Sequence, residues 1–395
     1  MDEHSTPSPP HMGKKLPKRI SDHDGRFLLG RILGTGSFSE VKLAVHTVTK
    51  LELAMKILNQ KRIEELGTKE MVQREIDHLR ICGAHPHLVR LYDVLEAPTN
   101  TCLVMEFASG GELHEYIQKQ KSGRLPVSKS RSYFQQITSA IEYMHYKNVV
   151  HRDLSLDNIL LDSTFRIIKI ADLGLSNLVR EGEFMHTPCG SPFFSAPEII
   201  SGKPYAGPGV DVWSCGVILY TLLCGCLPFH ENSMSLQFKK IKSGTYNLPK
   251  HLSKEAQSLI KKMLVVSTVE RITISAIRLH PWFQRQLLPN LQIFSNTIEL
   301  KGRKAVDSDV IDQVLKLYSS TITSHPEKVT RELLERAVTL EDGSSDNDNI
   351  QDLRCAYEII LDKKHERKYA NEDSHKKLFS WLGRAISIFA FAVLL

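Results

Sequence analysis

Three polar residues in the middle of the chain have the types and spacing for metal-assisted proton transfer. Asp153 lies in the segment HRDL, Asn158 follows it by five residues, and Asp172 comes fourteen residues after Asn158. A carboxylate can accept the proton of a hydroxyl group, and amide and carboxylate oxygens are ligands that suit Mg²⁺. The sequence therefore predicts that Asp153 is a base and that Asn158 and Asp172 hold a metal ion.

A glycine-rich segment, GTGSFS, begins at Gly34 and predicts a loop that holds phosphate. Glycines let backbone N–H groups approach phosphate oxygens closely. Such a loop is common, and Ser39 stands where the GxGxxG pattern has its third glycine. The context strengthens the interpretation, because Lys56 follows on a later β-rich run and Glu75 on the next helical run offers it an ion-pair partner.

A third element, the tripeptide APE, ends at Glu198, and a polar loop containing Thr187 precedes it. Five elements that could serve one phosphate-handling site thus follow one another along the chain: the glycine-rich loop, the lysine, the HRDL segment, the DLG segment and this tripeptide. Chance is a poor explanation for five such elements together.

The segments that must position these residues change in character along the chain. Three β-rich runs, FLLGRIL, EVKLAVH and LELAMKIL, predict an antiparallel meander, and a helix is expected over 68–81. Two further strands are expected over 89–95 and 101–107. Helical patterns then dominate, at 127–146, 210–223, 255–264 and 274–279. An α+β class follows, with a small β-rich lobe and a larger helical lobe.

With these elements in place, residues 27–283 resemble a eukaryotic protein kinase domain. The segments FMHTPCGSP, MEFASGGEL and HPHLVRLYDV are similar to those of the AMP-activated and sucrose-non-fermenting kinase catalytic subunits. Later segments, VIDQVL, RELLERAV and DLRCAYEIILDKK, resemble the ubiquitin-associated-like autoinhibitory module of that family. The resemblance implies a bilobal kinase fold followed by this small helical module.

The resemblance also implies roles for individual residues. Nucleotide would be bound by Leu33, Gly34, Thr35, Gly36, Ser37, Phe38, Ser39, Glu40, Val41, Lys56, Glu106 and Ala108. Lys56 and Glu75 would form the ion pair of the active state. Asp153 would be the base, and Asn158 and Asp172 would hold Mg²⁺. Glu198 and Arg271 would form a structural pair, and Thr187 would be an activating phosphosite with Arg152 as its partner.

The resemblance implies a serine/threonine kinase that uses ATP and Mg²⁺ and acts in energy or nutrient-stress signalling. The implied partners are protein substrates, an upstream activating kinase and β- and γ-type regulatory subunits. Localisation in the cytoplasm, and also in the nucleus, is expected.

Two departures from the family pattern bear on activity. Leu173 replaces the phenylalanine of Asp-Phe-Gly, and an apolar side chain is retained. Ser155 replaces the catalytic-loop lysine that helps to neutralise the transferred phosphoryl group, and Asp157 supplies no compensating cation. Loss of that charge would remove transition-state stabilisation. A catalytically impaired pseudokinase, acting as an ATP-binding regulatory scaffold, is therefore the alternative interpretation.

Composition narrows the remaining possibilities. The 395 residues carry 51 basic and 45 acidic side chains, for a net charge of +6, and no dense basic stripe that would indicate a nucleic-acid partner. Seven cysteines without a CxxC pair favour a reduced compartment, and the N-terminal residues do not predict a secretory signal.

The domain organisation follows from these patterns. We expect a disordered arm at 1–26, the kinase domain at 27–283, a linker at 284–305, the module at 306–368 and a tail with an apolar end at 369–395. The uninterrupted apolar run of the tail, 388–395, is shorter than the roughly 20 residues that cross a bilayer. A buried or interfacial helix is favoured there over membrane contact.

Overall fold

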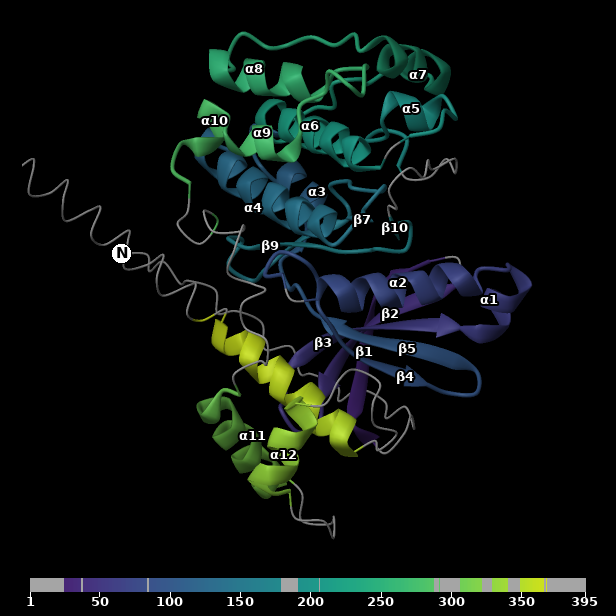
Figure 1. The fold of residues 1–395 in the computed structure, drawn as a ribbon, viewed down its shortest axis with the longest axis vertical. Helices are drawn as coiled ribbons and strands as arrows, with labels where there is room; N and C mark the ends of the chain where they lie inside the picture. The colour runs from purple at the N-terminus through teal and green to yellow at the C-terminus, as the bar shows by residue number, and fades with distance from the viewer. Residues whose placement is uncertain are drawn as a thin grey trace, which may run out of the picture. The chain divides into compact units, whose positions relative to one another are not determined.

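The computed structural model describes residues 25–36, 38–83, 85–178, 191–205, 207–287, 291, 306–321, 329–339, 349–365 and 367 (Figure 1). The chain divides into two compact units. The first comprises Met1–Leu58, Leu95–Val104 and Val306–Leu395, and the second comprises Asn59–Val94 and Met105–Ala305.

The β-rich part of the chain forms one five-stranded sheet. Its strands are β1 (Phe27–Thr35), β2 (Ser39–His46), β3 (Glu52–Asn59), β4 (Leu91–Glu96) and β5 (Asn100–Glu106), in the order β1-β2-β3-β5-β4. The first three strands pair as an antiparallel meander. The expected strands are therefore confirmed.

The turn between β2 and β3 closes through backbone hydrogen bonds. The N–H of Lys50 donates to the carbonyl of His46 at 2.9 Å, and Lys50 has a positive φ of 57°. Arg26, assigned from the sequence to the arm, is 9% exposed, and its carbonyl accepts the N–H of Thr47 at 2.8 Å. The ordered part of the first unit therefore includes Arg26.

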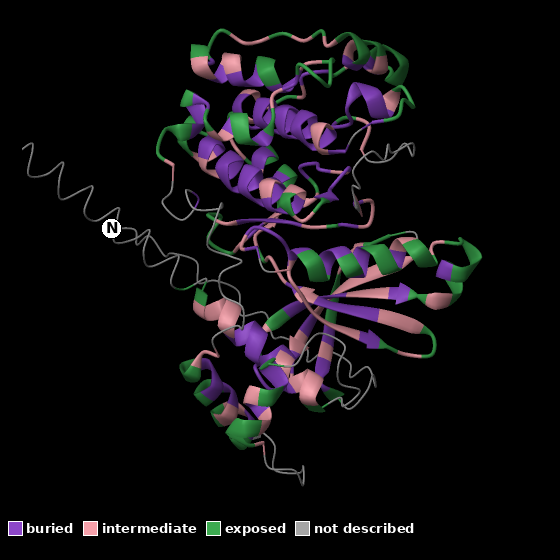
Figure 2. Ribbon diagram, viewed as in Figure 1, coloured by how far each residue is buried: buried purple, intermediate pink, exposed green. Residues whose placement is uncertain are grey.

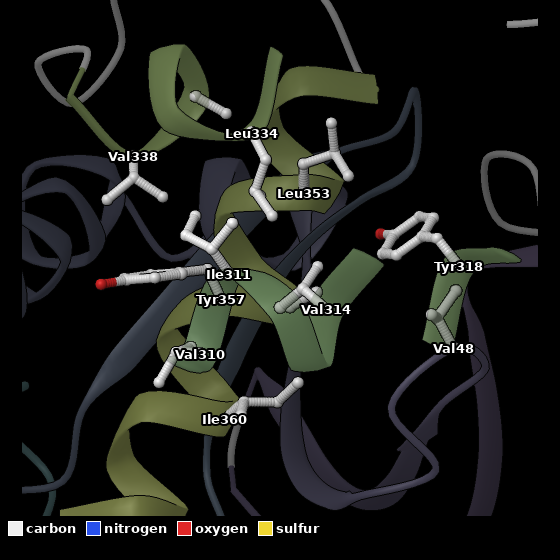
Figure 3. Close-up of a cluster of buried hydrophobic side chains, with 12 residues drawn as sticks. Val48, Val310, Ile311, Val314, Tyr318, Leu334, Val338, Leu353, Tyr357 and Ile360 are labelled. Atoms are coloured by element: carbon white, nitrogen blue, oxygen red, sulfur yellow. The ribbon is translucent and has the colours of Figure 1, made fainter. Parts of the chain in front are cut away.

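The C-terminal part of the first unit is a small helical module. It consists of α11 (Ser308–Thr321), α12 (Arg331–Thr339) and a helix over 349–365. These helices share a buried apolar cluster, and Val48 from the β2–β3 turn belongs to the same cluster (Figure 3). The cluster comprises Val48, Val310, Ile311, Val314, Tyr318, Leu334, Ala337, Val338, Leu353, Ala356, Tyr357 and Ile360. Residues 340–348 lie outside the described residues, and the last helix is described from Asn349.

The second unit is mainly helical. Its helices are α1 (Gln60–Glu65), α2 (Lys69–Cys82), α3 (Leu113–Gln118), α4 (Val127–Tyr146), α5 (Pro197–Ile200), α6 (Pro208–Cys224), α7 (Met234–Ser243), α8 (Lys254–Met263), α9 (Ile274–Arg278) and α10 (Pro281–Gln284). The nearly all-apolar sequence of α6 makes it the central buried helix of this unit (Figure 2). It ends at Gly225, which adopts the left-handed conformation with φ 77°.

Short strands in the second unit frame the segments that carry the predicted chemistry. Strands β6 (Gly111–Glu112), β8 (Ile159–Leu161) and β9 (Ile168–Ile170) form a small sheet in the order β6-β8-β9. A second pair joins β7 (Val149–Val150) to β10 (Asn177–Leu178). The HRDL segment follows β7, and the DLG segment lies between β9 and β10.

Helix α4 departs from the amphipathic pattern expected over 127–146, because polar residues on it are buried as well. Gln135 donates to the carbonyl of Phe283 at 2.6 Å, and Gln136 donates to the carbonyl of Arg166 at 2.9 Å. These side chains satisfy backbone carbonyls of neighbouring segments, so their burial does not leave polar groups unpaired.

Among the helices that the structure describes, none has the length and apolar character needed to cross a membrane. The predicted tail at 369–395, most of the linker at 284–305 and most of the arm lie outside the described residues.

Candidate active site

The HRDL segment is anchored by a single buried carboxylate, that of Asp211 on α6. Its two oxygens accept the backbone N–H of His151 at 3.0 Å and that of Arg152 at 2.9 Å. One of them also lies 2.8 Å from Nε2 of His145. Burial alone would raise the pKa of Asp211, but these hydrogen bonds and nearby histidines hold it below its ordinary value. The loop before Asp153 is therefore fixed to the core helix.

Asp153 is held by neighbours on both sides. Its Oδ1 accepts the backbone N–H of Ser191 at 2.7 Å, and its Oδ2 lies 3.3 Å from Nδ2 of Asn158. Arg152, the preceding residue, has a positive φ of 69°. A non-glycine residue in this region of backbone space is strained, and such strain concentrates at functional sites.

The environment of Asp153 tunes it as a base. Burial raises its pKa, and the neighbouring Asp172 carboxylate raises it further. The Ser191 N–H, His151 and the Asn158 amide oppose the rise, and the net direction is upward. A carboxylate with a raised pKa holds an accepted proton better than an ordinary aspartate does.

Asn158 and Asp172 carry donor atoms that suit Mg²⁺. The Asn158 amide nitrogen donates to the carbonyl of Asp153 at 2.7 Å, which leaves its side-chain oxygen as the donor for a cation. The N–H of Ala171 donates to the Asn158 carbonyl at 2.8 Å, so the two segments lie side by side. Asp172 has a positive φ of 59°, and its Oδ1 accepts the Gly174 N–H at 3.2 Å. The structure thus brings the two predicted metal ligands together.

The DLG segment contacts helix α2 through two polar groups. A Cβ added to Gly174 would lie 3.5 Å from a carboxylate oxygen of Glu75, so this buried glutamate lies against the segment. His78, one turn further along α2, lies 2.6 Å from the hydroxyl of Ser176. Leu173, the middle residue of the DLG segment, is 2% exposed, so leucine fills the apolar position expected for phenylalanine.

The glycine-rich loop joins β1 to β2 as a tight turn. The N–H of Gly36 donates to the carbonyl of Ser39 at 2.7 Å. A Cβ on Gly36 would lie only 2.8 Å from the Ser39 hydroxyl, so a side chain there would fill the turn. Glycine at 36 keeps the backbone open to an approaching phosphate, which fits the predicted nucleotide loop.

The other residues predicted to bind nucleotide are described by their place on β1, β2 and β3, and their role stays a prediction. Leu33, Gly34 and Thr35 end β1, Phe38 lies in the turn, Ser39, Glu40 and Val41 begin β2, and Ser37 lies outside the described residues. Lys56 lies on β3 directly opposite Val41. Lys56 belongs to the first unit and Glu75 to the second, so their ion pair stays a prediction.

Glu106 and Ala108 follow the core of β5. The backbone N–H of Glu106 donates to the carbonyl of Arg90 at 2.9 Å, and its carboxylate forms an ion pair with Lys169 at 2.5 Å. The carbonyl of Ala108 is 3.5 Å from the N–H of Gly111. Glu106 is buried, so its side chain fixes this segment and its backbone role stays a prediction.

The predicted structural pair is confirmed as a bidentate contact. Nη1 and Nη2 of Arg271 donate to the two carboxylate oxygens of Glu198 at 2.7 and 3.0 Å. The same guanidinium donates to the Gly209 carbonyl at 2.7 Å and lies 5.2 Å from the ring centroid of Trp213. This network ties the APE tripeptide to α6.

The sequence patterns did not predict two groups that hold the site, the Asp211 carboxylate and the Ser191 backbone N–H. Asp211 lies in a nearly all-apolar run that predicts only a buried helix, but a lone carboxylate in such a run is itself a signal of a buried polar partner. Ser191 contributes its backbone N–H to Asp153, and no side-chain pattern reveals a backbone donor.

Of the two remaining predicted residues, the structure describes Ser155 but not Thr187. Ser155 is 2% exposed, and its hydroxyl lies 3.4 Å from the N–H of Asn158, so it buttresses the loop. Thr187 lies outside the described residues, and its pairing with Arg152 stays a prediction.

The architecture and the site together define a class. Residues 27–283 match the family described as "Protein kinase domain", and the chain belongs to that family.

Within the protein kinase family, the chain is similar in sequence to several plant kinases. The chain is 50% identical over 289 residues to "Serine/threonine protein kinase OSK3" of Oryza sativa, covering 73% of this chain and 56% of that protein. It is 43% identical over 359 residues to "SNF1-related protein kinase catalytic subunit alpha KIN12" of Arabidopsis thaliana, covering 89% and 66%. It is 46% identical over 293 residues to "Carbon catabolite-derepressing protein kinase" of Secale cereale, covering 74% and 58%. The chain thus spans less than two-thirds of the length of these relatives, and the predicted resemblance to sucrose-non-fermenting-type kinases is confirmed.

Proposed function

We propose that this chain is a protein serine/threonine kinase that transfers the γ-phosphoryl group of ATP to protein hydroxyls. The observation that carries the proposal is the half-buried Asp153, whose carboxylate is held by the Ser191 N–H and lies beside Asn158. In this proposal its carboxylate accepts the proton of a substrate hydroxyl, while Asn158 and Asp172 would hold the metal. When bound, Mg²⁺ and ATP would supply the phosphoryl group and neutralise its charge.

The test is phosphotransfer from labelled ATP by the purified full chain. Asp153→Asn should lower kcat by at least about 100-fold, because positioned acid–base groups contribute roughly 10²–10⁴-fold. Glu255→Gln is the matched control, since it removes one carboxylate from an ion pair with Arg285 on a different surface of the same unit. Equal activity in Asp153→Asn and the control would refute the proposal.

A catalytically impaired scaffold is the second candidate, and Ser155 favours it. The Ser155 hydroxyl lies beside the backbone N–H of Asn158. Unlike the lysine that the family pattern has at this position, serine carries no positive charge to offer a phosphoryl group. Nucleotide binding without turnover would support this candidate. Nucleotide binding is measured as a rise in the melting temperature of the chain when ATP and Mg²⁺ are added, and turnover is measured as label transferred to a substrate.

We further propose that phosphorylation of Thr187 activates the kinase and that the module at 306–368 restrains it. A phosphate adds about −1.5 to −2 charges, which Arg152 next to the base can pair by charge-assisted hydrogen bonds. Energy or nutrient-stress signalling, an upstream kinase, β- and γ-type subunits and a cytoplasmic or nuclear location belong to the same proposal. The word "subunit" in the name of the Arabidopsis thaliana relative supports the regulatory subunits, and the resemblance of the module supports its restraining role.

A further inference from the structure

A buried hydrogen bond joins the middle of helix α2 to the turn that begins with the DLG segment. Nδ1 of His78 lies 2.6 Å from the hydroxyl of Ser176. His78 is 1% exposed and Ser176 is 3% exposed, so bulk water does not compete for either group. Both residues lie in the second unit. The contact therefore ties α2 to the turn over 172–176 within one unit.

The direction of this hydrogen bond follows from the other partner of Ser176. The Ser176 hydroxyl donates to the carbonyl of Leu173, and the Ser176 N–H donates to the same carbonyl at 3.0 Å. Because the hydroxyl proton is used there, Ser176 accepts from His78, and Nδ1 of the ring carries the proton. Burial lowers the pKa of His78, which favours the neutral ring. A relay of two hydrogen bonds thus runs from His78 through Ser176 to the Leu173 carbonyl.

A separate attachment holds the loop after α2 on the strand that leads into the DLG segment. The N–H of Val89 donates to the carbonyl of Ile170 at 2.8 Å, and the N–H of Ile170 donates to the carbonyl of His87 at 2.9 Å. Ile170 ends β9, two residues before Asp172. This backbone attachment lies beyond the C-terminal end of α2. The hydrogen bond of His78 fixes a second point, in the middle of the helix, and it is directional, whereas apolar packing is not.

The relay acts on the backbone that carries Asp172. Leu173 follows Asp172 directly, and its carbonyl is the last acceptor of the relay. Asp172 has a positive φ of 59°, a conformation that costs free energy for a non-glycine residue and persists where the surroundings hold it. Its Oδ1 accepts the Gly174 N–H at 3.2 Å, so the same turn orients the carboxylate. Holding the Leu173 carbonyl therefore helps to hold the carboxylate that is predicted to bind Mg²⁺.

The same helix brings a second carboxylate to this turn. A Cβ added to Gly174 would lie 3.0 Å from Oδ1 of Asp172 and 3.5 Å from Oε2 of Glu75, so the two carboxylates flank this glycine. Like charges repel each other, so the position of each carboxylate has to be set by its own element. Helix α2 carries Glu75, and the turn carries Asp172. His78 lies three residues after Glu75, and its relay ties these two elements together.

We propose that His78 is a positioning residue that acts through Ser176 to hold the Leu173 carbonyl and thereby sets the Asp172 carboxylate for its metal ion. The part that concerns the turn over 172–176 stands on the contacts alone. The part that concerns Mg²⁺ and phosphotransfer rests on the proposed function. His78 is not itself a ligand in this proposal.

The first test compares His78→Leu with the parent full chain by amide hydrogen exchange. Leucine fills much of the volume but removes the donor, so the Ser176 hydroxyl loses a partner. The N–H groups of Gly174 and Ser176 report on the turn, since both donate within it. Their exchange should accelerate about 2- to 10-fold, the range that one neutral hydrogen bond contributes. The N–H groups of Val89 and Ile170 should keep the parent rate, because their hydrogen bonds do not involve His78.

Two outcomes of this comparison would overturn the proposal. Equal acceleration at Val89 and Ile170 would show that His78 only stabilises the unit as a whole. Unchanged exchange at Gly174 and Ser176 would show that the relay does not hold the turn.

Gln73→Leu is the matched control, and His78→Asn is the conservative variant. Gln73 lies on the same helix and donates to Asp77 at 3.0 Å on the exposed surface, so its loss should leave exchange at Gly174 and Ser176 unchanged. In His78→Asn the amide nitrogen lies as many bonds from the backbone as Nδ1 and can donate to Ser176. Exchange should return to within about twofold of the parent rate. Acceleration in the control, or asparagine behaving like leucine, would overturn the relay.

Ser176→Ala approaches the relay from its other end and leaves α2 intact, so it covers the case in which His78→Leu does not fold. It should accelerate exchange at Gly174 by itself, and an unchanged rate would overturn the proposal. Adding His78→Leu to Ser176→Ala should have little further effect, because residues that act through one contact are not additive. Fully additive effects would overturn the relay.

Metal binding and turnover are separate readouts on the same samples. In His78→Leu, the Mg²⁺ concentration that gives half of the melting-temperature rise with ATP should increase about 2- to 10-fold, because Asp172 would be held less well. The Mg²⁺ concentration for half-maximal phosphotransfer should increase likewise, while the KM for a protein substrate stays within about twofold. An unchanged Mg²⁺ dependence would overturn the part that concerns the metal. If the parent chain transfers no label, the exchange and melting results still decide the role of His78, and only the proposed function fails.

Discussion

Replacing Asp211 by asparagine probes how the catalytic loop is held. In the parent chain one oxygen accepts from the Arg152 N–H at 2.9 Å, and the other accepts from the His151 N–H at 3.0 Å. Asparagine keeps a single acceptor oxygen, so one of the two amides would face an NH₂ group. His145 can adapt by accepting from that NH₂ through its other tautomer, but a backbone N–H cannot.

The magnitude follows from this count. One buried N–H left unsatisfied, together with the loss of charge assistance for the remaining bond, costs about 2–4 kcal/mol. For a unit of this size each kcal/mol lowers the melting temperature by roughly 2–4 °C. We therefore expect Asp211→Asn to lower the melting temperature of the second unit by about 4–16 °C. At temperatures where the variant is still folded, kcat should fall at least about tenfold, because the loop before Asp153 has lost an anchor.

The assay is thermal unfolding followed by tryptophan fluorescence, which senses Trp213 two residues from the substitution. Glu255→Gln serves as the control and should shift the transition by no more than about 1 °C, as exposed substitutions do. Because the pKa of Asp211 is depressed in the folded chain, its contribution is present above the unfolded pKa and is lost as the pH falls through the folded pKa. The difference between variant and parent should therefore shrink in acid. A melting temperature equal to that of the parent at neutral pH would refute the anchoring argument.

Four other outcomes follow from the site. Thr187→Ala should stay weakly active after treatment with an upstream kinase. Full activation of this variant, measured by phosphotransfer, would show that the activating phosphosite is another residue. Ser155→Lys should raise kcat with little change in the KM for ATP, because a restored cation acts on the transferring group; a variant no faster than the parent would show that another group already serves. The acid limb of kcat/KM should lie above the ordinary aspartate pKa of about 3.9, because burial raises the pKa of Asp153 and the base must be ionised to act; a limb at or below that value would contradict this. Arg271→Leu should destabilise the second unit by about 3–5 kcal/mol, since it leaves the buried Glu198 uncompensated, and a denaturant midpoint close to that of the parent would count against it.

Much of the fold could be predicted because periodicity and turn residues act locally. The first three strands and α2, α4 and α6 all appear close to their expected bounds. Helix α7 was not predicted, because its apolar residues are few and its lysines face solvent. The burial of α4 on most sides was missed for another reason. Its glutamines serve carbonyls of distant segments, and a helical period cannot show that.

Side-chain chemistry at the site was predictable where spacing carries it. Asp153 and Asn158 are in contact, and the N–H of Ala171, next to Asp172, donates to the Asn158 carbonyl. The pair of Glu198 and Arg271 forms as the resemblance implied. The Ser191 contribution could not be predicted, because every residue except proline has a backbone N–H. Nor could the contact of His46 with Asp352, since 306 residues separate them and no spacing links the segment that ends at His46 to the one that begins at Asp352.

That separation has a consequence for biosynthesis. The first unit is assembled from three separate stretches of chain, and its last stretch begins at Val306. At roughly 5–20 residues per second, a ribosome needs about 15–60 s to travel from His46 to Asp352. Throughout that interval Val48 and His46 have emerged and their covering helices have not been made. The nascent sheet therefore presents an uncovered apolar turn while the second unit is synthesised, and that turn is a site where a chaperone would engage the growing chain.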